Sequence, residues 1–154
     1  MPKIDIDKIA AMTGSGYPAP YRLRVAGREK KRLGDAGGLT QFGVNLTVLK
    51  PGAASALRHW HEQEDEFVYV LSGEATLIED GGESVLRAGE AAAFPAGAAN
   101  GHHLVNRSAA DVAFLEVGSR AATETVAYAD PEVDLRAVKD AQGWRFLRRD
   151  GTPW

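Results

Sequence analysis

The stretch that decides the fold is RHWHEQEDEFVYVLSGE, residues 58–74. It places two histidines and several acids directly before the apolar run FVYVL. If the chain around His59 is extended, His59 and His61 project from one face and Trp60 from the other. Glu66 follows after four intervening residues, enough for a tight turn that returns the chain on a neighbouring strand. The spacing therefore predicts two imidazoles and one carboxylate gathered at one point.

The strand that begins at Glu66 predicts burial on both sides. Its apolar residues are Val68 and Val70 on the Glu66 face, and Phe67, Tyr69 and Leu71 on the opposite face. An unpaired carboxylate in such surroundings costs several kcal/mol, roughly 2–7 kcal/mol or more. A divalent metal removes the conflict because it binds neutral imidazole and ionised carboxylate. The alternative is that both histidines are surface residues of a charged loop.

The composition limits the chemistry of such a site. The chain of 154 residues predicts one domain, residues 1–154, and contains no cysteine. Disulfides, iron–sulfur clusters and thiolate metal sites are thereby excluded, so any metal must be held by imidazole and oxygen. No apolar run approaches the roughly 20 residues of a membrane span, and the N-terminus lacks the apolar stretch of a secretory signal. We expect a soluble cytoplasmic protein with no membrane partner.

The charge pattern argues against nucleic acid as a partner. The net charge is −3 and the sequence pI is about 5.8, so the molecule as a whole has no cationic field. One basic stretch, RLRVAGREKKR at residues 22–32, is interrupted by glycine and has no interleaved aromatic residues. We interpret it as a solvated edge strand and loop whose lysines discourage edge pairing, with phosphate or nucleic-acid contact as the alternative.

The spacing of glycine and proline predicts an all-β fold. Short segments rich in Val, Leu, Phe, Tyr and Thr alternate with period two, giving about seven strands between Gln41 and Ser119. Asp80-Gly81-Gly82 marks a hairpin. In the flanks, residues 1–40 and 120–154, we predict a short helix over 4–12 and a late hairpin or docking tail. The tail carries Trp144, Phe146 and Trp154.

A further ligand must come from one of the two remaining histidines, His102 and His103. They follow the Pro/Gly-rich turn FPAGAANG, which can deliver the next strand to the mouth of a barrel. Adjacent residues of a strand face opposite ways, so one of the pair is expected to coordinate and the other to pack outward.

Two stretches resemble the two motifs of the cupin superfamily. The first motif is matched by Gly52, His59, His61, Glu66 and Gly73, with six residues instead of five between Gly52 and His59. The second is matched by Gly89, Pro95, Gly97, His102 and Asn106, with four residues instead of two between Gly97 and His102. The second departure leaves the choice between His102 and His103 open. The resemblance covers about residues 41–119.

The resemblance implies a jelly-roll β-barrel with N- and C-terminal extensions. It also implies a metal at the open end, held by His59, His61, Glu66 and His102, and often a homodimer. The chain looks like a bacterial subgroup of small single-domain cupins, some of them labelled sugar-phosphate-isomerase-like. A second copy, or the chain's own tails, would cover the outward Phe67, Tyr69 and Leu71.

Three imidazoles and one carboxylate on an octahedral ion leave two positions for substrate, and they favour Fe, Mn, Ni, Zn or Cu over Ca or Mg. We expect a metal-dependent small-molecule enzyme. The metal would act as a Lewis acid, in isomerase or lyase chemistry, or would activate oxygen as in a dioxygenase. Glu116 and Asn106 are the candidate catalytic residues, although Glu116 could be a satisfied rim carboxylate and Asn106 a turn cap. The alternative function is a non-catalytic module that binds or senses a small ligand.

Overall fold

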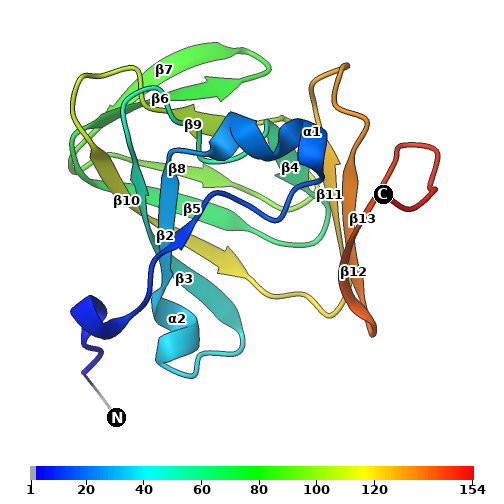
Figure 1. Ribbon diagram of the computed structural model, residues 1–154, viewed down its shortest axis with the longest axis horizontal. Helices are drawn as coiled ribbons and strands as arrows, with labels where there is room; N and C mark the ends of the chain where they lie inside the picture. The colour runs from blue at the N-terminus through cyan, green and yellow to red at the C-terminus, as the bar shows by residue number, and fades with distance from the viewer. Residues whose placement is uncertain (1–2) are drawn as a thin grey trace.

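The computed structural model describes residues 3–154 and consists mainly of strands (Figure 1). The helical elements are the 3-10 helices η1 (Ile6–Lys8) and η2 (Leu23–Val25) and the α-helices α1 (Ala19–Arg22) and α2 (Leu33–Ala36). The strands are β1 (Met12–Thr13), β2 (Arg28–Arg32), β3 (Phe42–Leu49), β4 (His59–His61), β5 (Glu66–Ser72), β6 (Glu74–Glu79), β7 (Gly82–Arg87), β8 (Ala91–Phe94), β9 (His103–Val105), β10 (Val112–Ser119), β11 (Glu124–Tyr128), β12 (Arg136–Asp140) and β13 (Gly143–Leu147). The all-β prediction is confirmed.

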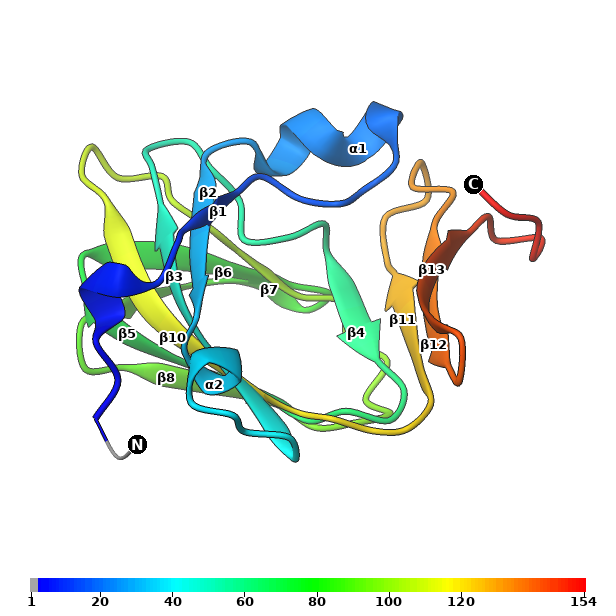
Figure 2. The ribbon, with the colours of Figure 1, turned by 60° about the horizontal axis from the view of Figure 1, so that its bottom comes forward.

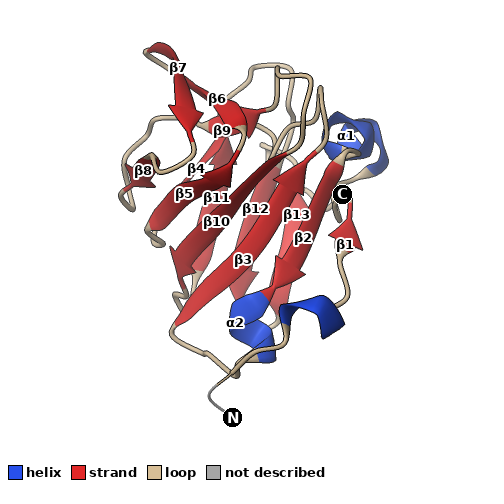
Figure 3. Cartoon of the chain, turned by 90° about the vertical axis from the view of Figure 1, so that its left-hand side faces the viewer, coloured by secondary structure: helices blue, strands red, loops and turns tan. Residues whose placement is uncertain are grey.

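The strands form three antiparallel sheets, in the orders β1-β2-β3-β10-β5-β8, β13-β12-β11-β4 and β7-β6-β9. Figure 2 shows β11, β12 and β13 on one side of the molecule and β3, β5 and β10 on the other. Figure 3 shows β2, β3 and β10 side by side in the largest sheet. The sheets do not close into one ring of ladders. Isolated bridges between His59 and His102 and between Ala54 and Val105 connect the chain around β4 to that around β9.

Two apolar clusters hold the sheets together. The first lies between the six-stranded and three-stranded sheets and is centred on the fully buried Leu49, Val70, Val112 and Phe114. The second packs the N-terminal segment against the four-stranded sheet and includes Tyr17, Tyr21, Val25, Leu57, Tyr128, Val133 and Leu135. Both flanks of the chain therefore contribute to the core, and among the described residues no helix is long and apolar enough to cross a membrane.

The flanks agree with the sequence in one place and differ in another. The predicted C-terminal hairpin is present as β12 and β13, whose register pairs Lys139 with Trp144. The helix predicted over residues 4–12 is reduced to the single turn η1, and Met12 instead begins β1 and pairs with Lys30. A helix of that length is only marginally stable on its own, so the pairing of β1 with β2 is preferred.

Two predictions about β5 are wrong. Glu66 does not return on a strand paired with the histidines, because β4 pairs with β11 while β5 lies between β10 and β8. The turn after His61 instead carries the chain from one sheet to another. In the single chain β5 is also buried on one face only, since Phe67, Tyr69 and Leu71 are 41%, 39% and 46% exposed.

Gly73 connects β5 to β6 with φ +75°, a conformation that side chains other than glycine rarely adopt. A Cβ at this position would also lie 2.6 Å from the carbonyl oxygen of Asp111. The close approach places β6 directly against the start of β10. Gly81, in the next loop, has no positive φ, and a Cβ there would meet nothing within 4 Å.

Gly73→Ala is expected to lower the free energy of unfolding by about 1–3 kcal/mol, because it adds both backbone strain and a clash. Gly81→Ala is the matched control and is expected to leave stability unchanged or slightly raised. Urea denaturation measures both variants. Equal stabilities for the two would contradict the geometry described at Gly73.

Candidate metal centre

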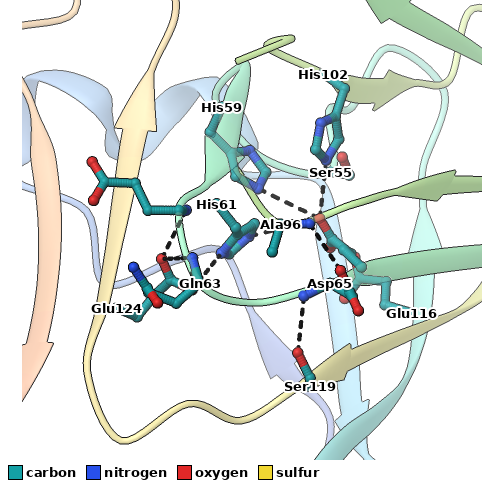
Figure 4. A network of polar contacts seen from close by, with 12 residues as sticks. Ser55, His59, His61, Gln63, Asp65, Ala96, His102, Glu116, Ser119 and Glu124 are labelled. Carbon is teal, nitrogen blue, oxygen red and sulfur yellow. Dashed lines mark hydrogen bonds and ion pairs between the residues drawn. The ribbon is translucent and has the colours of Figure 1, made fainter. Parts of the chain in front are cut away.

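The three histidines and the glutamate come from three different parts of the fold. His59 and His61 project from β4 in the four-stranded sheet, and Glu66 begins β5 in the six-stranded sheet. His102 precedes β9 and exchanges two backbone hydrogen bonds with His59, at 3.1 and 2.9 Å. Figure 4 shows the three imidazoles turned toward a common region. The candidate ligands predicted from the sequence are thus brought together.

The carboxylate of Glu66 lies at the centre of this group. Its Oε2 is 3.0 Å from Nε2 of His102, 3.7 Å from Nε2 of His61 and 3.8 Å from Nε2 of His59. Ligands bound at about 2.0–2.2 Å from one ion lie roughly 3 Å apart when adjacent in octahedral geometry. His59, His61 and Glu66 lie close enough to share one ion. His102, 3.0 Å from the same Glu66 oxygen, would join them after a movement of its ring.

Burial and charge set the protonation of the group. Burial lowers the pKa of His59 to about 3, although the Glu66 charge opposes that shift. Burial alone would raise the pKa of Glu66, but the hydrogen bond with His102 and the neighbouring imidazoles bring that pKa down to about 2. At neutral pH the site therefore holds a neutral His59 imidazole and an ionised carboxylate, which is the state that a divalent metal binds.

Outer partners orient two of the rings. Nδ1 of His59 lies 2.8 Å from the Leu57 carbonyl oxygen, and Nδ1 of His102 lies 3.3 Å from that of Asn100. A carbonyl only accepts hydrogen bonds, so Nδ1 of each ring carries a proton, and a ring that is neutral offers the lone pair of Nε2 to a cation. The 3.0 Å contact from His102 to Glu66 then requires a proton or a cation between the two atoms. This donor set fits a divalent transition metal.

The candidate ligands line a cavity of about 570 Å³. Glu116 on β10 and Lys30 on β2 also line it, and they form an ion pair with an Oε2 to Nζ distance of 2.6 Å. Gly118 on β10 lies opposite Glu66 on β5. Glu116 precedes Gly118 by two residues, so it faces inward on the same side of the strand. Glu116 therefore faces the cavity, and its ion pair with Lys30 also agrees with the alternative interpretation of a satisfied carboxylate. The sequence does not predict that Lys30 lines the cavity, because a basic stretch gives no indication of which alternate residues face inward.

Comparison with known proteins agrees with this geometry. The family described as Cupin domain matches residues 45–118. The chain is 50% identical to a protein from Silicibacter pomeroyi described as a sugar phosphate isomerase from a cupin superfamily, over 99% of this chain and 96% of that chain, with a TM-score of 0.94. The chain belongs to the cupin superfamily. A search among curated proteins finds no match.

Two further solved structures are less similar to this chain. A protein from Acidithiobacillus ferrooxidans, for which a sugar phosphate isomerase activity is also suggested, is 31% identical over 82% of this chain and 80% of that chain, with a TM-score of 0.73. The polyketide cyclase RemF from Streptomyces resistomycificus is 23% identical over 77% of this chain and 79% of that chain, with a TM-score of 0.63. The likeness to RemF shows the fold alone.

In this cupin the two adjacent histidines face different ways. His103 directs Nδ1 to the Ala56 carbonyl oxygen at 2.9 Å, and burial lowers its pKa. His102 faces Glu66 and is stacked on Phe94, with ring centroids 3.5 Å apart and planes 2° apart. The longer spacing in the second motif is therefore accommodated in the loop before His102, and it is His102 that joins the site.

Asn106, the other candidate catalytic residue, lies elsewhere. It is fully buried, and its amide nitrogen donates to the carbonyl oxygens of Leu49 and Ala110 at 2.9 and 2.8 Å. Its oxygen accepts from the backbone and hydroxyl of Ser108. Both polar atoms of the side chain are used, in the turn and at the end of β3, and Asn106 does not line the cavity described above. The geometry favours the turn cap over a role in catalysis.

The basic stretch also differs from its predicted solvated edge strand. β2 pairs with β3 along its length and with β1 at Glu29 and Lys30. Its alternate residues Arg28, Lys30 and Arg32 line the cavity. Arg28 donates to the carbonyl oxygens of Gly14 and Ser55, so it ties the N-terminal segment to the wall of the cavity.

A second group of candidate ligands, His61, Glu64 and Glu124, lies beside the first. Glu64 is 3.7 Å from the ammonium of Lys139 and accepts a hydrogen bond from the backbone of Ala121. The Glu124 carboxylate accepts hydrogen bonds from several backbone N–H groups. These carboxylates already have cationic or N–H partners, so the group has little need of an ion of its own.

We expect the stability of the metal-free cupin to fall as the pH drops below about 6.5. Between about pH 3 and 6.5 the unfolded chain protonates His59 while the folded chain does not. The unfolded state binds more protons there, so stability rises with pH, by at most about 1.4 kcal/mol per pH unit for this residue. Urea unfolding in EDTA from pH 4.5 to 6.5 should show a shallower slope for His59→Gln. Identical slopes in the variant and the parent would contradict the prediction.

Proposed function

We propose that this cupin is a metal-dependent enzyme that isomerises a small substrate by proton transfer. The observation that carries the proposal is the set of three imidazole Nε2 atoms around the Glu66 carboxylate, on the wall of a cavity of about 570 Å³. His59, His61, Glu66 and His102 would hold the metal. A bound divalent cation of this ligand set would supply Lewis-acid polarisation of a substrate carbonyl or hydroxyl.

The pair formed by Glu116 and Lys30 supplies acid–base chemistry. The Glu116 side chain is 11% exposed and that of Lys30 22%, so both act in a partly desolvated environment. Glu116 would accept a proton from the hydroxyl-bearing carbon next to a substrate carbonyl and return it to the former carbonyl carbon, while the hydroxyl proton passes to the former carbonyl oxygen. Lys30 would compensate the negative charge of Glu116 between turnovers. This pair supplies the base that isomerisation by proton transfer requires.

Cationic side chains support an anionic substrate such as a sugar phosphate. Arg32 and Arg120 line the cavity and both contact Asp35, which leaves donors of each guanidinium for a ligand. The cupin from Silicibacter pomeroyi, similar over almost the whole chain, is described as a sugar phosphate isomerase. A non-catalytic module that binds or senses such an anion is the alternative function.

The metal is tested first, by elemental analysis of the purified protein and by metal binding to His61→Ala. We expect a stoichiometric transition metal in the parent protein, and loss of tight binding with the fold retained in the variant. Activity is then followed by NMR in D₂O with a panel of sugar phosphates, where proton transfer introduces deuterium beside the carbonyl. Glu116→Gln is expected to lose about 10²–10⁴-fold of this activity while the metal stays bound.

Glu83→Gln is the matched control, because Glu83 is an exposed carboxylate on β7 that forms an ion pair with Arg107. It is expected to keep full activity. A metal-loaded protein that is silent with every substrate, but binds sugar phosphates, would favour the sensing module. A parent protein that binds no transition metal would refute the metal-dependent proposal.

We also propose that the cupin is a homodimer in which a second copy covers the outer face of β5. Phe67, Tyr69 and Leu71 form an exposed apolar row on this face. The chain's own extensions lie elsewhere, because β1 is at the far end of the same sheet and β12 and β13 belong to another sheet. Burying the row against its copy would remove it from water. The cytoplasmic location predicted from the sequence remains a prediction.

Light scattering with size-exclusion chromatography should give twice the chain mass of 16.5 kDa for the parent protein. Tyr69→Lys is expected to shift the mass toward that of one chain, because it places a charge in the apolar row. Val85→Lys changes an equally exposed residue on β7 and is expected to leave the mass unchanged. A parent protein with the mass of one chain would refute the dimer.

A further inference from the structure

We propose that Glu124 is a positioning residue that fixes the ring of His61 for metal binding. The inference rests on the proposed metal site and concerns a carboxylate outside the four candidate ligands. Glu124 begins β11, the strand that pairs with β4, and Val126 lies opposite His61. Figure 4 shows Glu124 beside His61, on the side of the ring away from His102.

The three rings of the site differ in their outer partners. His59 and His102 direct Nδ1 to backbone carbonyl oxygens, whereas Nδ1 of His61 is buried and has no hydrogen-bond partner among residues 3–154. Its ion-pair partner on that side is Oε2 of Glu124, at 3.9 Å. A hydrogen bond between these atoms would be about 2.7–3.2 Å long, so a ring movement of about 1 Å would close it.

The carboxylate of Glu124 is held rigidly for this role. Its side chain is fully buried. Oε1 accepts hydrogen bonds from the backbone N–H groups of Glu62, Gln63 and Thr125, at 3.0, 3.1 and 2.7 Å. Oε2 receives only a longer bond of 3.2 Å from Gln63 and is directed at His61. Oε1 therefore accepts the main hydrogen bonds from the backbone of the turn after β4, and Oε2 is left to accept one from the imidazole of His61.

A carboxylate at this position has a defined chemical effect. When Nδ1–H donates to Glu124, Nε2 of His61 carries the lone pair and faces Glu66, as ligation requires. The negative charge also makes that Nε2 a stronger donor to a cation. Outer-shell carboxylates that orient a metal-binding histidine typically raise metal affinity about 10–100-fold.

The substitution Glu124→Gln tests this effect with little change of shape. Three backbone N–H groups keep the amide oxygen in the place of Oε1, so the amide NH₂ takes the place of Oε2 and faces His61. An NH₂ group donates, and it favours the tautomer in which Nδ1 accepts and Nε2 carries the proton. That tautomer cannot bind metal through Nε2.

The experiment measures Zn²⁺ affinity by competition with a chelator. Glu124→Gln is expected to bind Zn²⁺ about 10–100-fold more weakly than the parent protein. Glu83→Gln is the control, because Glu83 is a carboxylate on β7 that pairs with Arg107 and belongs to neither group of candidate ligands. It is expected to bind Zn²⁺ as the parent does. Equal affinities in all three proteins, or equal losses in the two variants, would overturn the proposal.

Nitrogen-15 NMR of the metal-free protein provides a readout that a purely structural role would not move. In the parent protein we expect His61 to carry its proton on Nδ1, and in Glu124→Gln on Nε2. A parent protein with the proton on Nε2 would overturn the proposal even if the variant failed to fold. Failure of the parent to bind Zn²⁺ would refute the metal site alone, because the tautomer of His61 is measured without metal.

Discussion

The ionised carboxylate of Glu66 among three buried imidazoles is the interaction on which the rest of the structure depends. A carboxylate removed from water is costly unless a cation or hydrogen-bond donors surround it. Here the hydrogen bond with His102 and the adjacent rings offset burial and hold the pKa of Glu66 at about 2. Burial keeps His59 neutral at the same time. The two shifts together describe a site prepared for a positive ion.

This cluster also joins three separate sheets, in addition to the two apolar clusters that hold them together. β4, β5 and the chain before β9 each belong to a different sheet, and each contributes at least one of the four side chains. The backbone bridge between His59 and His102 fixes two of them directly. Glu66 reaches the site from the third direction, where Gly118 of β10 lies opposite it. Metal binding and sheet packing should therefore reinforce each other, because both bring the same three segments together.

The sequence allowed the strand core and the shared orientation of His59 and His61 to be predicted because their signals are local, whereas the choice between His102 and His103 stayed open. Period-two alternation places His59 and His61 on one face whatever the strand pairs with. Which strands pair with each other depends on distant residues. For this reason the sequence predicted a hairpin after His61, whereas the turn crosses from one sheet to another. Lys30 and Glu124 escaped prediction for the same reason. Their role depends on which distant residue they face, and one basic or acidic side chain in a strand gives no sign of that.

The position of the candidate site residues, inside or outside the shared family core, bears on function. All four candidate ligands fall within residues 45–118, the part that matches the Cupin domain family. Lys30, Arg32 and Arg120 lie outside it, as does Glu124, yet the first three line the cavity and Glu124 contacts a candidate ligand. The shared core thus contains the residues that could hold a metal, and the extensions add charged side chains to a cavity wall that the core also lines. Since a fold shared by many cupins does not determine chemistry, similarity that includes the extensions carries more weight. The cupin from Silicibacter pomeroyi covers 99% of this chain, extensions included, and RemF covers 77%. We therefore expect the charged residues of the flanks, and not the shared motifs, to distinguish the cavity of this protein from those of other cupins.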